Sequence, residues 1–322
     1  MNNGPPLIFG HLGQDGTILR RSLAFRGVEC VGVSRGHVEY FNSEGQLFRR
    51  RRRPALVSEV LRDVAPSEIY YLAASHSSSE GNLNEALDMS SYCSYFSENV
   101  NPYLELLESA SEIAPKARIF FAASSKVFSP DSGDFLDETS PLSPETFYGM
   151  AKAQALWLSR KYRSSRSLFV TVGTLFNHES SLRPESFLSA RVIKAALNIK
   201  SGGLEPLVIR SLGDSVDWSL AAEFVEGMQL VLRASEPDDF LFCSGRKNTV
   251  QEFVEEVFSE LEIETKGNVR VLEGKNTPRR KALGLGTNQK VFRATGWRPT
   301  ESFSDFVRAL VQEHLSDSPL VH

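Results

Sequence analysis

Short apolar runs alternate with amphipathic stretches through the first part of the chain. Residues 7–9 are all apolar, residues 17–25 carry apolar side chains at helical spacing, and residues 30–33 are again small and apolar. The helical stretch ends at Gly27, a residue type that is common just after the last turn of a helix. This order of strand, loop, helix and strand predicts a βαβ unit and a parallel sheet with helices on both faces.

The alternation continues to about residue 178 and then changes. Hydrophobic periodicity predicts helices over 57–64, 92–113 and 146–162, and strands over 69–72, 119–122 and 168–172. Later segments predict a return to the first domain over 218–232 and 240–243, and helices of a smaller part over 249–261 and 303–315.

We therefore predict an α/β fold, a Rossmann-type doubly wound parallel sheet with a smaller, interleaved C-terminal α/β substrate domain. The expected boundaries are 1–177 for the dinucleotide-binding domain, with return segments at about 213–245, and 178–212 together with 246–322 for the substrate domain.

Charge and cysteine content exclude several classes of protein. Lys and Arg number 36 against 40 Asp and Glu, and this slightly acidic balance argues against a nucleic-acid partner. The three cysteines form no CxxC pair, so we expect a reducing compartment, no disulfide framework and no metal site. No apolar run approaches the roughly 18 residues of a membrane span, and no secretory leader is recognisable. We expect a cytoplasmic protein without a membrane partner.

Five consecutive arginines occupy residues 49–53, just before Pro54. Their ordinary interpretation is a solvated turn. The alternative is a contact with an anion or a partner, for example a phosphate.

Three glycines follow the first predicted strand at the spacing GxxGxxG: Gly10, Gly13 and Gly16. Glycine permits the tight turn and lets the backbone approach a pyrophosphate at the N-terminus of the following helix. Arg35 ends the second strand, where a cation favours the 2′-phosphate of NADP over NAD. The alternative for Arg35 is an ordinary surface arginine.

A tyrosine and a lysine four residues apart, Tyr148 and Lys152, lie on the predicted helix 146–162. Positions i and i+4 share a helix face, so an ammonium next to the phenol is expected to lower its pKa and let it take a proton from a sugar hydroxyl. Ser124 ends the preceding strand with a hydroxyl able to orient the reacting oxygen.

With these residues the chain resembles the extended short-chain dehydrogenase/reductase family, and within it the GDP-mannose 4,6-dehydratases. The loop at 10–16, the segment 69–74 and the hexapeptide 175–180 (Leu-Phe-Asn-His-Glu-Ser) carry the resemblance. It implies Ser124, Tyr148 and Lys152 as catalytic residues and NADP as the cofactor. The implied cofactor contacts are Gly10, Gly13, Gln14, Asp15, Gly16, Arg35, Leu72, Ala73, Ala74, Tyr148, Lys152, Leu175 and His178.

The resemblance also implies a nucleotide-sugar substrate, with a GDP-hexose favoured, and a homodimer or homotetramer built through helices 92–113 and 146–162. The substrate contacts expected are Ser125, Lys126, Asn177 and Arg191. The dehydratases carry a glutamate at the position of Lys126, and arginines at the positions of Val216 and Thr277. A carboxylate can remove the C5 proton of the sugar, whereas an ammonium cannot.

Three reactions therefore remain open. A dehydratase-like reaction follows from the resemblance, and a 4-ketoreductase or a 4-epimerase follows from Lys126. A non-catalytic NADP-binding relative is the remaining alternative. His178, Asn177 and His76 each have a structural interpretation next to the functional one, as a hydrogen-bonded loop histidine or a turn-forming asparagine.

Overall fold

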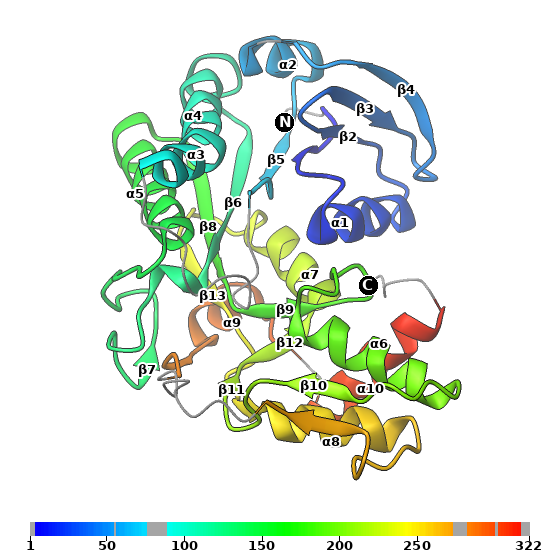
Figure 1. The fold of residues 1–322 in the computed structure, drawn as a ribbon. Helices are drawn as coiled ribbons and strands as arrows, with labels where there is room; N and C mark the ends of the chain where they lie inside the picture. Colours follow the sequence, from blue (N-terminus) through cyan, green and yellow to red (C-terminus); the bar gives the residue numbers. More distant parts are fainter. Residues whose placement is uncertain (1–3, 55, 76–88, 273–281, 300–301, 317–322) are drawn as a thin grey trace.

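A twisted eight-stranded sheet forms the framework of the larger part of the molecule (Figure 1). The computed structural model describes residues 4–54, 56–75, 89–272, 282–299 and 302–316. The strand order is β13-β8-β6-β5-β1-β2-β3-β4. Six neighbouring strands are parallel: β1 (Leu7–Phe9), β2 (Cys30–Val33), β5 (Glu68–Tyr71), β6 (Arg118–Ser124), β8 (Phe169–Leu175) and β13 (Asp239–Phe242).

The last two strands of the sheet are an addition that we did not predict. β3 (His37–Phe41) is antiparallel to β2, and β4 (Leu47–Arg52) is antiparallel to β3. The sheet is thus mostly, not wholly, parallel. The expected turn over residues 49–53 is wrong for most of its length, because residues 49–52 belong to β4, where they pair with residues 37–40.

Helices cover both faces of the sheet, as the apolar runs of its buried strands require. On one face α2 (Val57–Val64), α4 (Asn101–Ile113) and α5 (Phe147–Arg166) pack on a core that includes Tyr103, Phe121 and Val170. On the other face α1 (Gln14–Phe25) and α7 (Ala221–Val231) pack on Tyr70, Phe120 and Phe242. This arrangement confirms the doubly wound fold.

Local sequence explains where the covering helices lie. The buried positions of α2 are Val57, Val60, Leu61 and Val64, the i, i+3, i+4, i+7 spacing of an amphipathic helix. The expected single helix over 92–113 is instead two, α3 (Met89–Asn99) and α4, with Pro102 in the first turn of α4. Proline is tolerated there because a backbone N–H in the first turn of a helix has no carbonyl acceptor within the helix, so its absence costs no hydrogen bond.

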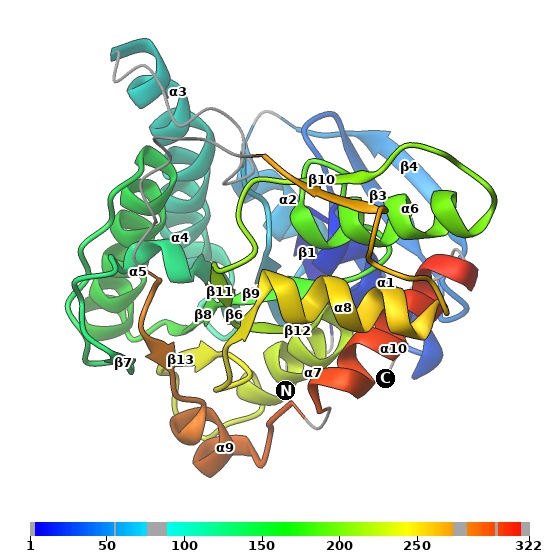
Figure 2. The ribbon, with the colours of Figure 1, turned by 60° about the horizontal axis from the view of Figure 1, so that its bottom comes forward.

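A second group of helices forms a separate core below the sheet. Figures 1 and 2 both place α6 (Leu188–Lys200), α8 (Val250–Glu260) and α10 (Phe303–Ser316) together, and their buried faces meet around Phe253, Phe258 and Phe306. The short parallel pair β10 (Leu207–Ile209) and β15 (Val269–Val271) adjoins them.

Three short strand pairs and two short helical segments complete the described part of the chain. β9 (Asn177–Glu179) pairs in parallel with β12 (Trp218–Leu220). This pair lies between the large sheet and the group of helices α6, α8 and α10 (Figure 1). The remaining elements are β7 (Phe135–Leu136), β11 (Ser215–Val216), β14 (Asn248–Thr249), β16 (Leu285–Gly286), the 3-10 turn η1 (Ser125–Val127) and α9 (Gln289–Thr295). Among the residues described, no helix combines the length and the apolar character that crossing a membrane requires.

Candidate active site

The glycine loop lies at the carboxyl edge of the sheet, between β1 and α1. Gly10 has a φ of +86°, and a Cβ at this position would lie 2.7 Å from the backbone nitrogen of Ala73. The loop is therefore in direct contact with residues 72–73, which follow β5. Gly13 is the N-cap of α1 and has no side chain to accept from the first N–H groups of the helix. Such a helix start, with donors not satisfied by a cap, suits a pyrophosphate.

Two side chains of the first turn of α1 tie the loop to β9. Asp15 accepts a hydrogen bond from Nε2 of His178 at 3.1 Å, and Gln14 donates from Nε2 to the carbonyl oxygen of His178 at 3.1 Å. Ser180 donates to Oε1 of Gln14 at 2.8 Å. Burial alone would raise the pKa of Asp15, but the charge of His178 and hydrogen bonds from His178 and Gln14 lower it to about 2. His178 is thus buried and engaged with the glycine loop.

This network predicts a pH-dependent contribution to stability. Because the pKa of Asp15 is below its ordinary value of 3.8, its carboxylate stabilises the fold above about pH 4, and this contribution is lost as the pH falls toward 2. We expect Asp15→Asn to lower the free energy of unfolding by about 1–2 kcal/mol at pH 7. Urea unfolding between pH 7 and pH 3 measures the difference. A difference that does not shrink between pH 5 and pH 3 would contradict the assignment.

Ser124, Tyr148 and Lys152 come together beside this loop. Ser124 is the last residue of β6, and Tyr148 and Lys152 lie in the first two turns of α5. Ser124 and Tyr148 share a side-chain hydrogen bond. The Lys152 ammonium lies 5.8 Å from the centroid of the Tyr148 ring and donates to the carbonyl oxygen of Ala122 at 2.7 Å. The spacing-based prediction that phenol and ammonium share one helix face matches this placement.

Burial sets the titration of both groups. It raises the pKa of Tyr148 to about 12, against the opposing effects of the hydrogen bond with Ser124 and the charge of Arg183. It lowers the pKa of Lys152 to about 8, with Asp15 acting in the opposite direction. The protein groups by themselves therefore do not give the low tyrosine pKa that we expected, because burial outweighs the groups that lower it. In these surroundings Tyr148 is a phenol at neutral pH.

The other expected site residues differ in how exposed they are. Leu175 ends β8 and is buried, Ser125 is buried in η1, and Asn177 is exposed at the start of β9. Leu72 and Ala73 are half-buried, and Ala74 is exposed. Lys126 is exposed, and Arg191 lies half-buried in α6. His76 and Thr277 lie outside the described residues.

Arg35 is paired with a carboxylate that lies outside the glycine loop. Its guanidinium forms an ion pair of 3.1 Å with Glu98 of α3, and its side chain is 87% exposed. An exposed pair of this kind contributes little to stability, so it can be exchanged for a stronger anion.

Arg183 is a residue of the site that the sequence analysis missed. It donates to the carbonyl oxygen of His178 at 2.9 Å and pairs with the buried carboxylate of Glu179 at 3.3 Å. Its positive charge acts on the pKa values of both Asp15 and Tyr148. The available signal was its position just after the hexapeptide 175–180.

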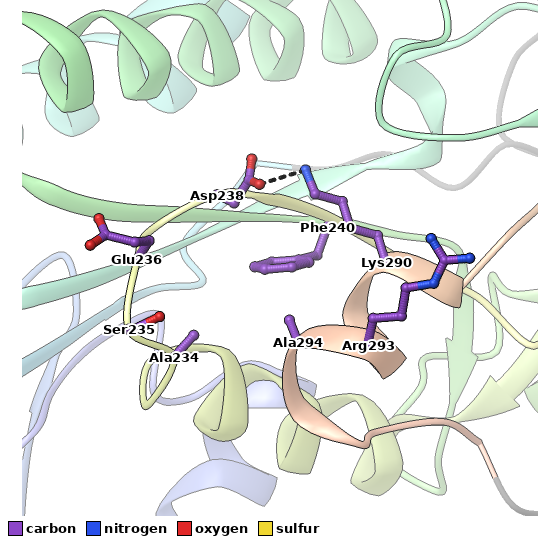
Figure 3. Close-up of a pocket in the computed structure, with 8 residues that line it drawn as sticks. All are labelled: Ala234, Ser235, Glu236, Asp238, Phe240, Lys290, Arg293 and Ala294. Atoms are coloured by element: carbon purple, nitrogen blue, oxygen red, sulfur yellow. Dashed lines mark ion pairs between the residues drawn. The ribbon is translucent and has the colours of Figure 1, made fainter.

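A surface hollow of about 370 Å³ lies elsewhere, before the amino end of β13 (Figure 3). Phe240 forms its floor, and Lys290 and Asp238 form an ion pair of 2.7 Å beside it. Because β13 is parallel to its neighbour β8, this hollow is on the opposite edge of the sheet from Tyr148. It is not part of the candidate site.

Comparisons with known proteins agree with this geometry. A family model described as GDP-mannose 4,6 dehydratase matches residues 7–310. The GDP-mannose 4,6 dehydratase of Cricetulus griseus is 28% identical, over 95% of this chain and 90% of that protein. Two solved structures have a TM-score of 0.77: dTDP-glucose 4,6-dehydratase from Bacillus anthracis in complex with NAD, and RMD from Pseudomonas aeruginosa complexed with NADPH. They are 16% and 18% identical, and each match covers at least 97% of both chains.

Proposed function

Because the chain belongs to the GDP-mannose 4,6-dehydratase family, we propose that it is an NADP-dependent enzyme that acts at C4 of the hexose of a nucleotide sugar, with a GDP-hexose favoured. The main supporting observation is the contact of Tyr148 with Ser124, next to Lys152 and the glycine loop at one edge of the sheet. Binding alone would not require these three side chains together.

The residues around the glycine loop fit a dinucleotide. A Cβ at Gly10 would collide with Ala73, and the start of α1 has no side-chain cap, which leaves backbone donors for a pyrophosphate. When bound, the nicotinamide supplies the hydride acceptor and donor for C4. The chain would hold the dinucleotide through Gly10, Gly13, Gln14, Asp15, Gly16, Arg35, Leu72, Ala73, Ala74, Tyr148, Lys152, Leu175 and His178.

The protein side chains then move one proton and orient one oxygen. The Oη of Tyr148 exchanges a proton with the C4 oxygen of the sugar, and the hydroxyl of Ser124 holds that oxygen in place. Lys152 would hold the cofactor ribose, and its ammonium near the Tyr148 ring would stabilise the phenolate that forms when Tyr148 gives up its proton, against the opposing effect of burial. The pKa of about 12 that burial gives Tyr148 makes proton donation to a C4 carbonyl the easier direction.

Two observations support a second candidate, a 4-ketoreductase or 4-epimerase. Lys126 replaces the acidic residue expected of a dehydratase, and it is exposed, so its ammonium has no electron pair with which to remove a C5 proton. Burial raises the pKa of Tyr148, so this side chain is a phenol that can donate the proton a 4-ketoreductase needs, whereas a 4-epimerase, like a dehydratase, must first take a proton from the C4 hydroxyl. Neither reaction requires a base at C5. Ser125, Lys126, Asn177 and Arg191 remain the proposed substrate contacts.

The organisation of the protein is part of the same proposal. The dinucleotide domain comprises 1–177 with return segments at about 213–245, and 178–212 with 246–322 bind the nucleotide sugar. The family resemblance supports a homodimer or homotetramer through α3, α4 and α5. The three cysteines, none of them in a disulfide, support a cytoplasmic location.

Incubation with GDP-hexoses in D₂O tests the reaction. A dehydratase incorporates deuterium at C5 of its product and leaves the absorbance of the reduced cofactor unchanged, because hydride is returned to the sugar. A 4-ketoreductase, which needs a GDP-4-keto-hexose added in place of the hexose, consumes the reduced cofactor and leaves the hydrogen at C5 in place. A 4-epimerase changes neither the cofactor absorbance nor C5. We expect C4 chemistry in every case. Binding of NADPH with no change in any sugar tested would contradict an enzymatic function.

A further inference from the structure

The arginine run forms the carboxyl end of β4 and the residue after it. β4 is antiparallel to β3, which is antiparallel to β2, so β4 runs in the same direction as β2. The carboxyl ends of β2 and β4 therefore meet at the same edge of the sheet as the glycine loop, where open α/β sheets bind their ligands.

Backbone hydrogen bonds place Arg52 and Arg53 next to the turn that carries Arg35. Gly10 N–H donates to the carbonyl of Val33 at 3.1 Å, at the end of β2. Three residues later the carbonyl of Gly36 accepts from Arg53 N–H at 2.9 Å, and His37 pairs with Arg52. Burial raises the pKa of Tyr71, the last residue of β5, and the charge of Arg53 opposes this rise, which places Arg53 near the carboxyl end of β5 as well.

The five arginines differ in their partners. Arg49 lies over the ring of Tyr40 at 4.9 Å, Arg50 pairs with Glu39 at 2.5 Å, and Arg51 pairs with Asp63 at 2.6 Å. Within the described part of the chain, neither Arg52 nor Arg53 has an ion pair. Arg52 is exposed and Arg53 is half-buried. The two arginines of the run that lie nearest the carboxyl edge of the sheet are thus the two with no carboxylate partner among the residues that the structure describes.

A buried contact fixes this hairpin to the glycine loop. Glu39 of β3 is 4% exposed and accepts from Nε2 of His11, inside the loop, at 2.5 Å. Its other oxygen accepts from Arg50 of β4 at 2.5 Å. The position of the arginine strand is therefore coupled to that of the loop. Because Glu39 is engaged on both sides, it is not available to bind a ribose hydroxyl.

We propose that Arg52 and Arg53, together with Arg35, bind the 2′-phosphate of the dinucleotide and make the protein selective for NADPH over NADH. This inference rests on the proposed function, since it presumes a dinucleotide in the glycine loop. Guanidinium groups bind phosphate with paired hydrogen bonds, and two or three of them offset its charge of about −2 near neutral pH. Arg35 reaches the phosphate by exchanging its exposed pair with Glu98.

Affinities for NADPH and NADH in a double variant, Arg52→Ala with Arg53→Ala, test the proposal. Isothermal titration at fixed salt should show NADPH bound about 10- to 100-fold more weakly than by the unmodified protein, from the loss of two charged contacts, with NADH changed less than about twofold. Arg49→Ala is the matched control on the same strand, because its side chain lies on Tyr40. It should leave both affinities unchanged.

Competition by adenosine 2′,5′-bisphosphate and by adenosine 5′-monophosphate gives a second measurement on the unmodified protein. We expect the bisphosphate to displace NADPH at a concentration at least tenfold lower. Equal affinities for the two nucleotides, an unchanged double variant, or equal losses for NADPH and NADH would overturn the proposal and leave the proposed function standing. Failure of the unmodified protein to bind either dinucleotide would instead contradict the proposed function.

Discussion

Replacing Tyr148 by Phe is expected to lower kcat by about 10³-fold or more, because general acid–base groups contribute roughly 10²–10⁴-fold and no second phenol shares the contact with Ser124 among the described residues. The substitution removes one oxygen and keeps the ring, so α5 retains its packing. Cofactor affinity should stay within a few-fold, since the backbone of the glycine loop is untouched. Turnover with the GDP-hexose found active in the D₂O experiment measures the first quantity, and NADPH titration measures the second.

The control for this variant is a phenol that is buried but distant from Ser124. Tyr103 of α4 is buried and shares a hydrogen bond of 2.7 Å with Ser159, which is a buried residue of α5. Tyr103→Phe should cost about 1 kcal/mol of stability and leave kcat unchanged. Turnover by Tyr148→Phe equal to that of the unmodified protein would exclude Tyr148 as the proton-transfer group. A loss shared equally by both variants would indicate a general structural effect.

A substitution at Gly149 is expected to disable the site without removing any catalytic group. A Cβ at this position would lie 2.3 Å from the backbone carbonyl oxygen of Lys126, which cannot rotate away as a side chain can. In Gly149→Ala, either η1 or the start of α5 must move, and with it the contact between Ser124 and Tyr148. We expect kcat to fall about 100-fold or more, since a displacement of about 1 Å can cost that much.

The stability of Gly149→Ala should fall by about 1–3 kcal/mol, as for other overpacked positions. Thermal unfolding checks this, and kcat is measured well below the new midpoint. Met150→Ala is the matched control, because it changes the next residue of the same helix turn and its side chain is 37% exposed. It should leave both quantities nearly unchanged. Full activity in Gly149→Ala would show that α5 does not need this close approach to η1.

Local pattern was sufficient to predict most of the layered framework. The apolar runs at β1, β2 and β6 and the helical spacing at α2 and α5 involve neighbours in sequence, so periodicity reports them directly. The family resemblance, carried by motifs at 10–16 and 175–180, was confirmed by the family model that matches residues 7–310. In the structure Ser124 lies next to Tyr148, because both residues lie at the carboxyl edge of a parallel sheet.

The hairpin of β3 and β4 could not be predicted in the same way. Five successive arginines carry no alternation of apolar and polar residues, and their strand conformation depends on pairing with β3 and on partners distant in sequence, such as Asp63. The break between α3 and α4 was visible as Pro102, but the apolar periodicity continued across it.

By itself, the sequence determined the order of strands and helices, the identity of the candidate catalytic groups and the family, because each of these is written in neighbouring residues. Only the tertiary structure decided the electrostatics. Burial between α5 and β6 raises the pKa of Tyr148 to about 12, and the contact of Asp15 with His178 across 163 positions lowers the Asp15 pKa to about 2. A pKa depends on how deeply a group is buried and on which charges lie near it in space, and the spacing of residues along the chain specifies neither.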